Sequence, residues 1–99
     1  MILRRDRFAD LVRRQLDLFR EDEAELLREA EEALDRYNAA EREEAEELYG
    51  DYGLVLDAVG DALDELRDAY ARTLDGDAAV AYAASFDRAV RKRFPSLPR

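Results

Sequence analysis

The stretch YNAAEREEAEEL, residues 37–48, decides the fold of this chain, because the apolar repeats on its two sides are out of phase. The upstream repeat keeps apolar residues on one stripe of a helix by a 3,4 alternation. It comprises Val12, Leu16, Phe19, Leu26, Ala30, Ala33, Tyr37 and Ala40. Continued in the same helix, it would reach Glu44, Glu47 and Asp51 instead of apolar residues. We therefore expect the first helix to end within residues 38–44 and a second helix to follow.

The second apolar repeat begins directly after this interruption and defines the second helix. It comprises Ala45, Leu48, Tyr52, Val55, Val59, Ala62, Leu66, Ala69 and Thr73. A turn at residues 50–53, where two glycines flank an aspartate and a tyrosine, is the alternative place for the chain to reverse. We favour residues 38–44, because the second repeat passes through residues 50–53 in phase. The pattern then predicts two antiparallel helices of about 33 to 36 residues, each about 50 Å long.

Four residues at the expected helix ends have turn or capping chemistry. Asn38 is expected either to end the first helix in the left-handed conformation or to cap the second helix, with Glu41 completing a capping box. Gly76 is expected to take a positive φ at the end of the second helix, and Asp77 to cap the third.

A shorter third helix is expected from Ala78 to about Phe94. Its apolar face comprises Ala79, Tyr82, Ala83, Phe86, Ala89, Val90 and Phe94. Pro95 ends this helix, because the residue before a proline is driven out of the helical region.

Together these patterns predict an all-α fold, a long antiparallel helical hairpin with a shorter third helix packed against it as a three-helix bundle. The predicted helices span about residues 4–38, 42–75 and 78–94. We assign residues 1–94 to a single helical domain. Residues 95–99 form a C-terminal tail, which we expect either to fray or to act as a short docking peptide.

The composition excludes much familiar enzyme chemistry. The chain has 99 residues, of which 47% are hydrophobic and 41% charged, and it has no cysteine and no histidine. Disulfides, thiolate metal sites and thiol nucleophiles are therefore ruled out, as are the commonest metal ligand and the usual general base. No cofactor is expected. No apolar stretch reaches the length of a signal peptide or a membrane span, so we expect a cytoplasmic protein without a membrane partner.

The net charge of −9 is unevenly distributed along the chain. Residues 1–20 carry +3, residues 21–47 carry −10, residues 48–87 carry −7 and residues 88–99 carry +5. A third helix of this length is expected to hold the basic tail away from the N-terminal arginines, so that no joint basic patch forms and no nucleic acid is bound. The acidic middle of the chain is also compatible with a protein that imitates nucleic acid and binds to a basic partner protein.

Glu23 is the one acid on the first apolar stripe. A buried carboxylate without a partner is costly. We therefore expect Glu23 either to pair with an arginine of the third helix, Arg88 or Arg91, or to lie where the stripe is exposed.

The third helix is too short to cover the hairpin, since about 17 residues span only about half of 50 Å. The half nearer residues 38–44 then lacks apolar partners. The residues left short of contacts are Leu26, Leu27, Leu34, Tyr49, Tyr52 and Leu56. A bare apolar strip commonly marks an interface. We therefore predict a non-enzymatic interaction or assembly module, one that self-associates into a homodimer with a four-helix core or docks another protein.

The alternative function rests on clustered carboxylates, which are the ligands that hard divalent cations prefer. One cluster lies near the end of the first helix and the other near the start of the second. The candidate ligands are Glu31, Glu32, Asp35, Glu43, Glu44, Glu47 and Asp51. A turn within residues 38–44 would bring the two clusters near each other.

The stretch EELYGD, residues 46–51, resembles the acidic helix motifs of the all-α, MazG-type nucleotide pyrophosphohydrolases. This resemblance implies a dimeric, magnesium-dependent enzyme. Glu47 and Asp51 stand four residues apart, whereas the family's second motif places its Asp three residues after its Glu. Because helices rich in glutamate produce such strings often, the interaction module remains our preferred interpretation.

Overall fold

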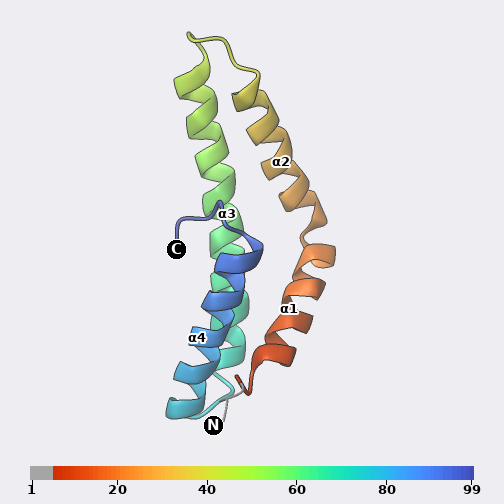
Figure 1. The fold of residues 1–99 in the computed structure, drawn as a ribbon, viewed down its shortest axis with the longest axis vertical. Coiled ribbons are helices and arrows are strands. Elements are labelled where there is room, and N and C mark those ends of the chain that lie inside the picture. The colour runs from red at the N-terminus through yellow and green to blue at the C-terminus, as the bar shows by residue number, and fades with distance from the viewer. Residues whose placement is uncertain (1–5) are drawn as a thin grey trace, which may run out of the picture.

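The computed structural model describes residues 6–99 and contains four α-helices. They are α1 (Ala9–Asp22), α2 (Ala24–Asn38), α3 (Ala45–Ala71) and α4 (Gly76–Arg93), shown in Figure 1. No strand occurs among the described residues. The predicted all-α fold class is confirmed.

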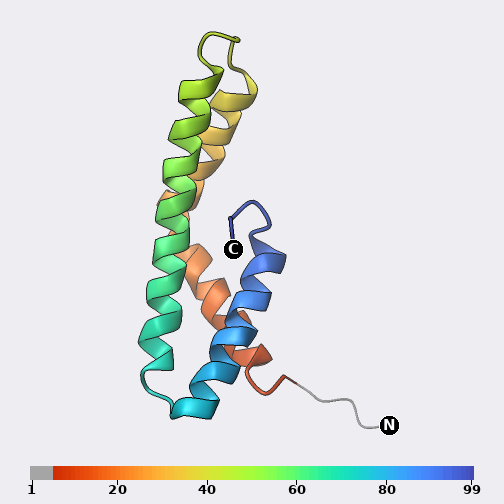
Figure 2. The same cartoon turned by 90° about the vertical axis from the view of Figure 1, so that its left-hand side faces the viewer.

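The helices divide the elongated molecule into two halves. In the upper half, α2 packs mainly against α3, and the two helices run in opposite directions. In the lower half, α4 packs against both α1 and α3, and it ends well below the top of the molecule (Figures 1 and 2). The hydrophobic core therefore has three helices around it only in the lower half.

The core is built from the apolar faces that the repeats define. The buried apolar residues of the connected core are Phe8, Val12, Leu16 and Phe19 from the N-terminal side, Val59 and Leu63 from α3, Tyr82, Phe86 and Val90 from α4, and Leu97 from the tail. Ala33 of α2 is also buried but lies outside this cluster. Aromatic rings meet edge to face within it, with centroids 5.6 Å apart for Phe8 and Tyr82 and 6.0 Å apart for Phe19 and Phe94. Such pairs stabilise a core beyond their buried area.

The predicted single helix at residues 4–38 requires a correction, because the described part is divided at Glu23. Glu23 has φ of −108° and ψ of 27°, although its N–H still donates to the Phe19 carbonyl at 2.8 Å. The break falls at the one acid on the apolar stripe, where continued burial would be costly. Glu23 stays half-buried, and neither Arg88 nor Arg91 forms an ion pair with it. The break directs α1 toward α4 while α2 follows α3.

The chain reverses at residues 39–44, where the phase slip predicts it, and α3 passes through residues 50–53 as helix. The expected cap chemistry is wrong at both turns. Asn38 is the last residue of α2, and α3 begins without a side-chain cap. Gly76 is the first residue of α4, and no residue of the described chain has a positive φ. Turns with i to i+3 hydrogen bonds end α2 and α3 instead, which satisfies terminal carbonyls without a left-handed residue.

The separation into halves is visible in the dimensions of the molecule. The extents are 54, 31 and 22 Å, and the radius of gyration of the Cα atoms is 16.3 Å. A compact chain of this length has a radius of gyration of about 13 Å. The excess comes from the upper half, where α2 and α3 extend beyond α4 (Figure 2).

Candidate interaction surface

A groove lies between α2 and α3 directly above the end of α4, and we call it the hairpin groove. Its volume is about 280 Å³. Apolar side chains dominate its lining, which comprises Leu27, Ala30, Leu34, Tyr52, Leu56, Val59, Phe94, Pro95 and Leu97 together with Arg20, Glu31, Arg93 and Ser96. The groove occupies the place that a longer α4 would fill. Its lining is therefore apolar because α2 and α3 keep their repeats beyond the point where α4 ends.

The residues predicted from the uncovered strip lie mainly at this groove. Leu27, Leu34, Tyr52 and Leu56 line it. Tyr49, which is 61% exposed, borders a second hollow that shares Tyr52 and Leu56 with the groove. Leu26 lies outside both hollows and packs against the core, as Leu27 and Leu56 also do from the groove. The structure thus brings five of the six residues to one connected surface.

The tip of the hairpin presents aromatic surface above the groove. The rings of Tyr37 and Tyr49 lie 5.2 Å apart between their centroids, with an angle of 56° between their planes. This contact joins the end of α2 to the start of α3 and holds the tip together where no third helix is present.

The C-terminal tail forms the lower wall of the groove and is well packed, in contrast to the expected frayed end. Leu97 is only 8% exposed and packs against the core. Its N–H donates to the carbonyl of Phe94 at 3.1 Å. Ser96 borders both the hairpin groove and the hollow near Tyr49.

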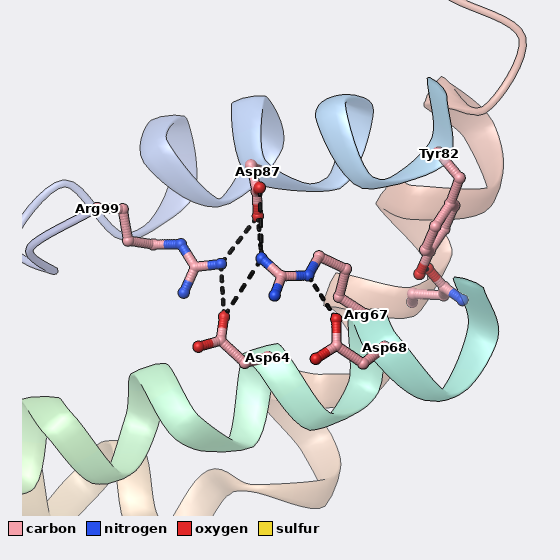
Figure 3. Close-up of polar contacts among 7 residues, drawn as sticks. Asp64, Arg67, Asp68, Tyr82, Asp87 and Arg99 are labelled. Atoms are coloured by element: carbon pink, nitrogen blue, oxygen red, sulfur yellow. Dashed lines mark hydrogen bonds and ion pairs between the residues drawn. The ribbon is translucent and has the colours of Figure 1, made fainter. Parts of the chain in front are cut away.

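A cluster of ions, the tail clamp, fixes the end of the tail and comprises Asp64 and Arg67 of α3, Asp87 of α4 and Arg99 (Figure 3). The Arg99 guanidinium lies 2.9 Å from a carboxylate oxygen of Asp64 and 2.9 Å from one of Asp87. Arg67 donates to Asp87 at 3.0 Å and to Asp68 at 2.9 Å. With its side chain only 12% exposed, Arg99 ties the tail to both helices in a partly desolvated setting.

Two groups of the clamp, Asp87 and Arg67, are held in their ionised forms by their partners. Partial burial opposes ionisation of Asp87, but hydrogen bonds from Arg99 and Arg67 outweigh it and hold the pKa of Asp87 below its ordinary value of 3.8. The hydrogen bond to Asp68, followed by the interactions with Asp87, raises the pKa of Arg67.

A second polar cluster ties the start of the chain to α4 at the lower end of the molecule. The Ser85 hydroxyl donates to Asp6 at 2.6 Å, and the Arg88 guanidinium donates to the same oxygen at 2.8 Å. The hydrogen bond from Ser85 is the main cause that lowers the pKa of Asp6. Deeper in the core, the Tyr82 hydroxyl donates to Gln15 at 2.7 Å, and burial raises the pKa of Tyr82 to about 12.

The expected separation of the basic ends also requires a correction, because α4 runs back along α1. Arg13, Arg88, Lys92 and Arg93 line one hollow there. Each of the three arginines forms an ion pair with an aspartate, at distances of 2.7 to 3.2 Å. These pairs neutralise most of the local positive charge. Arg4 and Arg5 lie outside the described residues.

The acidic residues predicted as ligands of a divalent cation lie in the upper half of the molecule, but they do not form a common site. Glu31, Glu32 and Asp35 are exposed on α2, while Glu43, Glu44, Glu47 and Asp51 are exposed at the turn and on the first turns of α3. Glu32 pairs with Arg28. Within residues 6–99, no group of three or more acidic side chains is placed to hold a metal ion.

Neither the tail clamp nor the packing of the tail was predicted from the sequence. Leu97, an apolar residue between two prolines, was the available signal that the tail packs on the chain. Arg99 pairs with residues 12 and 35 positions away, at no regular spacing that a pattern could reveal.

Neither a scan against protein-family models nor searches of curated proteins and of solved structures find a match to this chain. None of the helices within the described residues combines the length and the apolar character needed to cross a membrane.

Proposed function

We propose that this protein is a non-enzymatic helical assembly module that acts as a homodimer through the hairpin groove. The observation that carries the proposal is the groove itself, an apolar surface between α2 and α3 with no third helix over it. A second copy placed on this surface would complete a four-helix core in the upper half.

The side chains of the groove favour an interface over a folding core. Leu34 and Tyr52 lie in the groove without packing against the buried cluster, and Tyr49 is mostly exposed. Aromatic residues are enriched in the buried centres of interfaces, where they contribute large apolar area at little entropic cost. A partner that covered these residues would add to the contacts that they make within one chain.

Sedimentation equilibrium tests the proposal with two matched variants. Leu34→Glu places a charge in the groove, and Leu18→Glu makes the same change at a site on α1 that is 57% exposed and outside the groove. We expect wild type and Leu18→Glu to form dimers at micromolar concentration and Leu34→Glu to be monomeric with unchanged helical circular dichroism. Monomeric wild type, or equal association by both variants, contradicts the proposal.

A further inference from the structure

We infer that the partner in the hairpin groove is a second copy of this chain in antiparallel orientation, with the acidic tip of each copy at the basic lower end of the other copy's groove. This inference rests on the self-association proposed above and adds its orientation. It follows from the charges at the tip of the hairpin and at the lower end of the groove, and from the distance between them.

The tip of the hairpin, which lies above the groove and outside its lining, is strongly acidic. Residues 41–47 contain five glutamates and one arginine, and both the loop and the first turn of α3 that they form are exposed apart from Ala45. Within the described part of the chain, none of these glutamates takes part in an ion pair. A parallel dimer would place two such tips together, and like charges brought together across an interface are strongly unfavourable.

The lower end of the groove is basic. Arg20 and Arg93 line it together with Glu31, and Arg93 also pairs with Asp17 at 2.7 Å. The positive charge of this end therefore comes mainly from Arg20 and from the exposed Arg91 and Lys92 in the last turn of α4. The Arg20 guanidinium lies over the Phe94 ring at 5.4 Å from its centroid, which holds it at the groove wall. The acidic tip and this basic end therefore lie at opposite ends of the hairpin's upper half, with the groove between them.

The distance from the tip of the hairpin to the lower end of the groove makes this pattern self-complementary. Ala45 at the tip and Val59 at the lower end are 14 positions apart in α3, a distance of about 21 Å along the helix. A two-fold axis across the middle of the groove would place the tip of one copy at the lower end of the other, and the reverse contact follows by symmetry. Both apolar faces are covered and both pairs of opposite charges are brought together.

Cysteine crosslinking tests the orientation directly, because the chain has no cysteine of its own. Glu44→Cys marks the tip and Ser96→Cys marks the lower end of the groove, and both positions are exposed. The two variants are prepared separately, mixed, and treated with a short bismaleimide, so that any bond between positions 44 and 96 joins two chains. Asp77→Cys, exposed at the far end of α4, replaces Ser96→Cys in the control mixture.

We expect a covalent dimer in the mixture of Glu44→Cys and Ser96→Cys, linked between those positions by peptide mass spectrometry, and little product from either variant alone or from the control mixture. A covalent dimer from Glu44→Cys alone overturns the antiparallel orientation. The orientation is also overturned if the protein is dimeric by sedimentation but no sample gives a crosslinked product. Monomeric wild type by sedimentation overturns the homodimer itself, so the two failures are distinguishable.

Discussion

Phe86 lies at the centre of the core, with no exposed surface, and its ring centroid is 6.0 Å from that of Tyr82. Replacing a buried phenylalanine by alanine removes apolar contacts and leaves a cavity. We expect Phe86→Ala to lower the free energy of unfolding by about 3 to 5 kcal/mol, as measured by urea denaturation. Val80→Ala on the exposed face of the same helix, where Val80 is 72% exposed, serves as the control and should change it by less than about 0.5 kcal/mol. Similar losses for both variants would show that the core is misplaced.

The hydroxyl of Tyr82 provides a second test at the level of a single residue. Burial raises its pKa to about 12, so an ultraviolet titration should contain a last step near pH 12. Tyr82→Phe should remove that last step and, by leaving Gln15 without its donor, lower the free energy of unfolding by about 1 kcal/mol. A titration with no step near pH 12, or one that Tyr82→Phe leaves unchanged, would contradict the burial of this hydroxyl.

At the scale of elements, α3 runs without interruption through its glycines. At Gly50 and Gly60 an added Cβ would meet no atom within 4 Å, and neither residue has a positive φ. We expect Gly50→Ala and Gly60→Ala each to raise the free energy of unfolding by about 0.5 to 1 kcal/mol, because alanine loses less entropy in a helix. Destabilisation by Gly50→Ala, measured by thermal unfolding, would instead support a turn at residues 50–53.

The tail clamp makes the position of the C-terminal tail sensitive to acid. Because the pKa of Asp87 is lowered in the folded chain, its ion pairs stabilise the packed tail above the ordinary value of 3.8 and lose that contribution as the pH falls below it. We expect the methyl resonances of Leu97 to move toward those of an exposed leucine in this range. Asp87→Asn should shift them already at neutral pH, whereas Asp61→Asn, at an exposed site outside the clamp, should not. Resonances that do not respond to pH or to Asp87→Asn would contradict the clamp.

Local periodicity explains which elements were predictable from sequence. The phase slip across residues 37–48 correctly located the hairpin turn, because a helix must keep its apolar face toward one partner. The apolar pattern did not predict the division between α1 and α2 at Glu23, because only one residue leaves the helical conformation and the apolar stripe continues on both sides. The tail and its clamp depend on contacts between distant residues, which no local repeat records.

At the scale of the whole molecule, the elongated shape follows from the difference in length between α4 and the hairpin of α1, α2 and α3. α4 has 18 residues and covers only the lower part of the face formed by α1, α2 and α3. Five of the six residues of the predicted strip, all except Leu26, lie at the groove or the adjoining hollow, because their placement required only helix lengths and apolar positions. How a second copy would lie on it depends on the charges at the tip of the hairpin and at the lower end of the groove, which become adjacent to that strip only in the folded chain.

The central claim, that the uncovered upper half pairs with a second copy, is tested most directly by small-angle X-ray scattering over a series of concentrations. Our account predicts that the mass from forward scattering rises from 11.4 kDa toward twice that value, while the radius of gyration rises above the 16.3 Å of the single chain. A mass that stays at 11.4 kDa and a radius that stays near 16.3 Å at every concentration would contradict it.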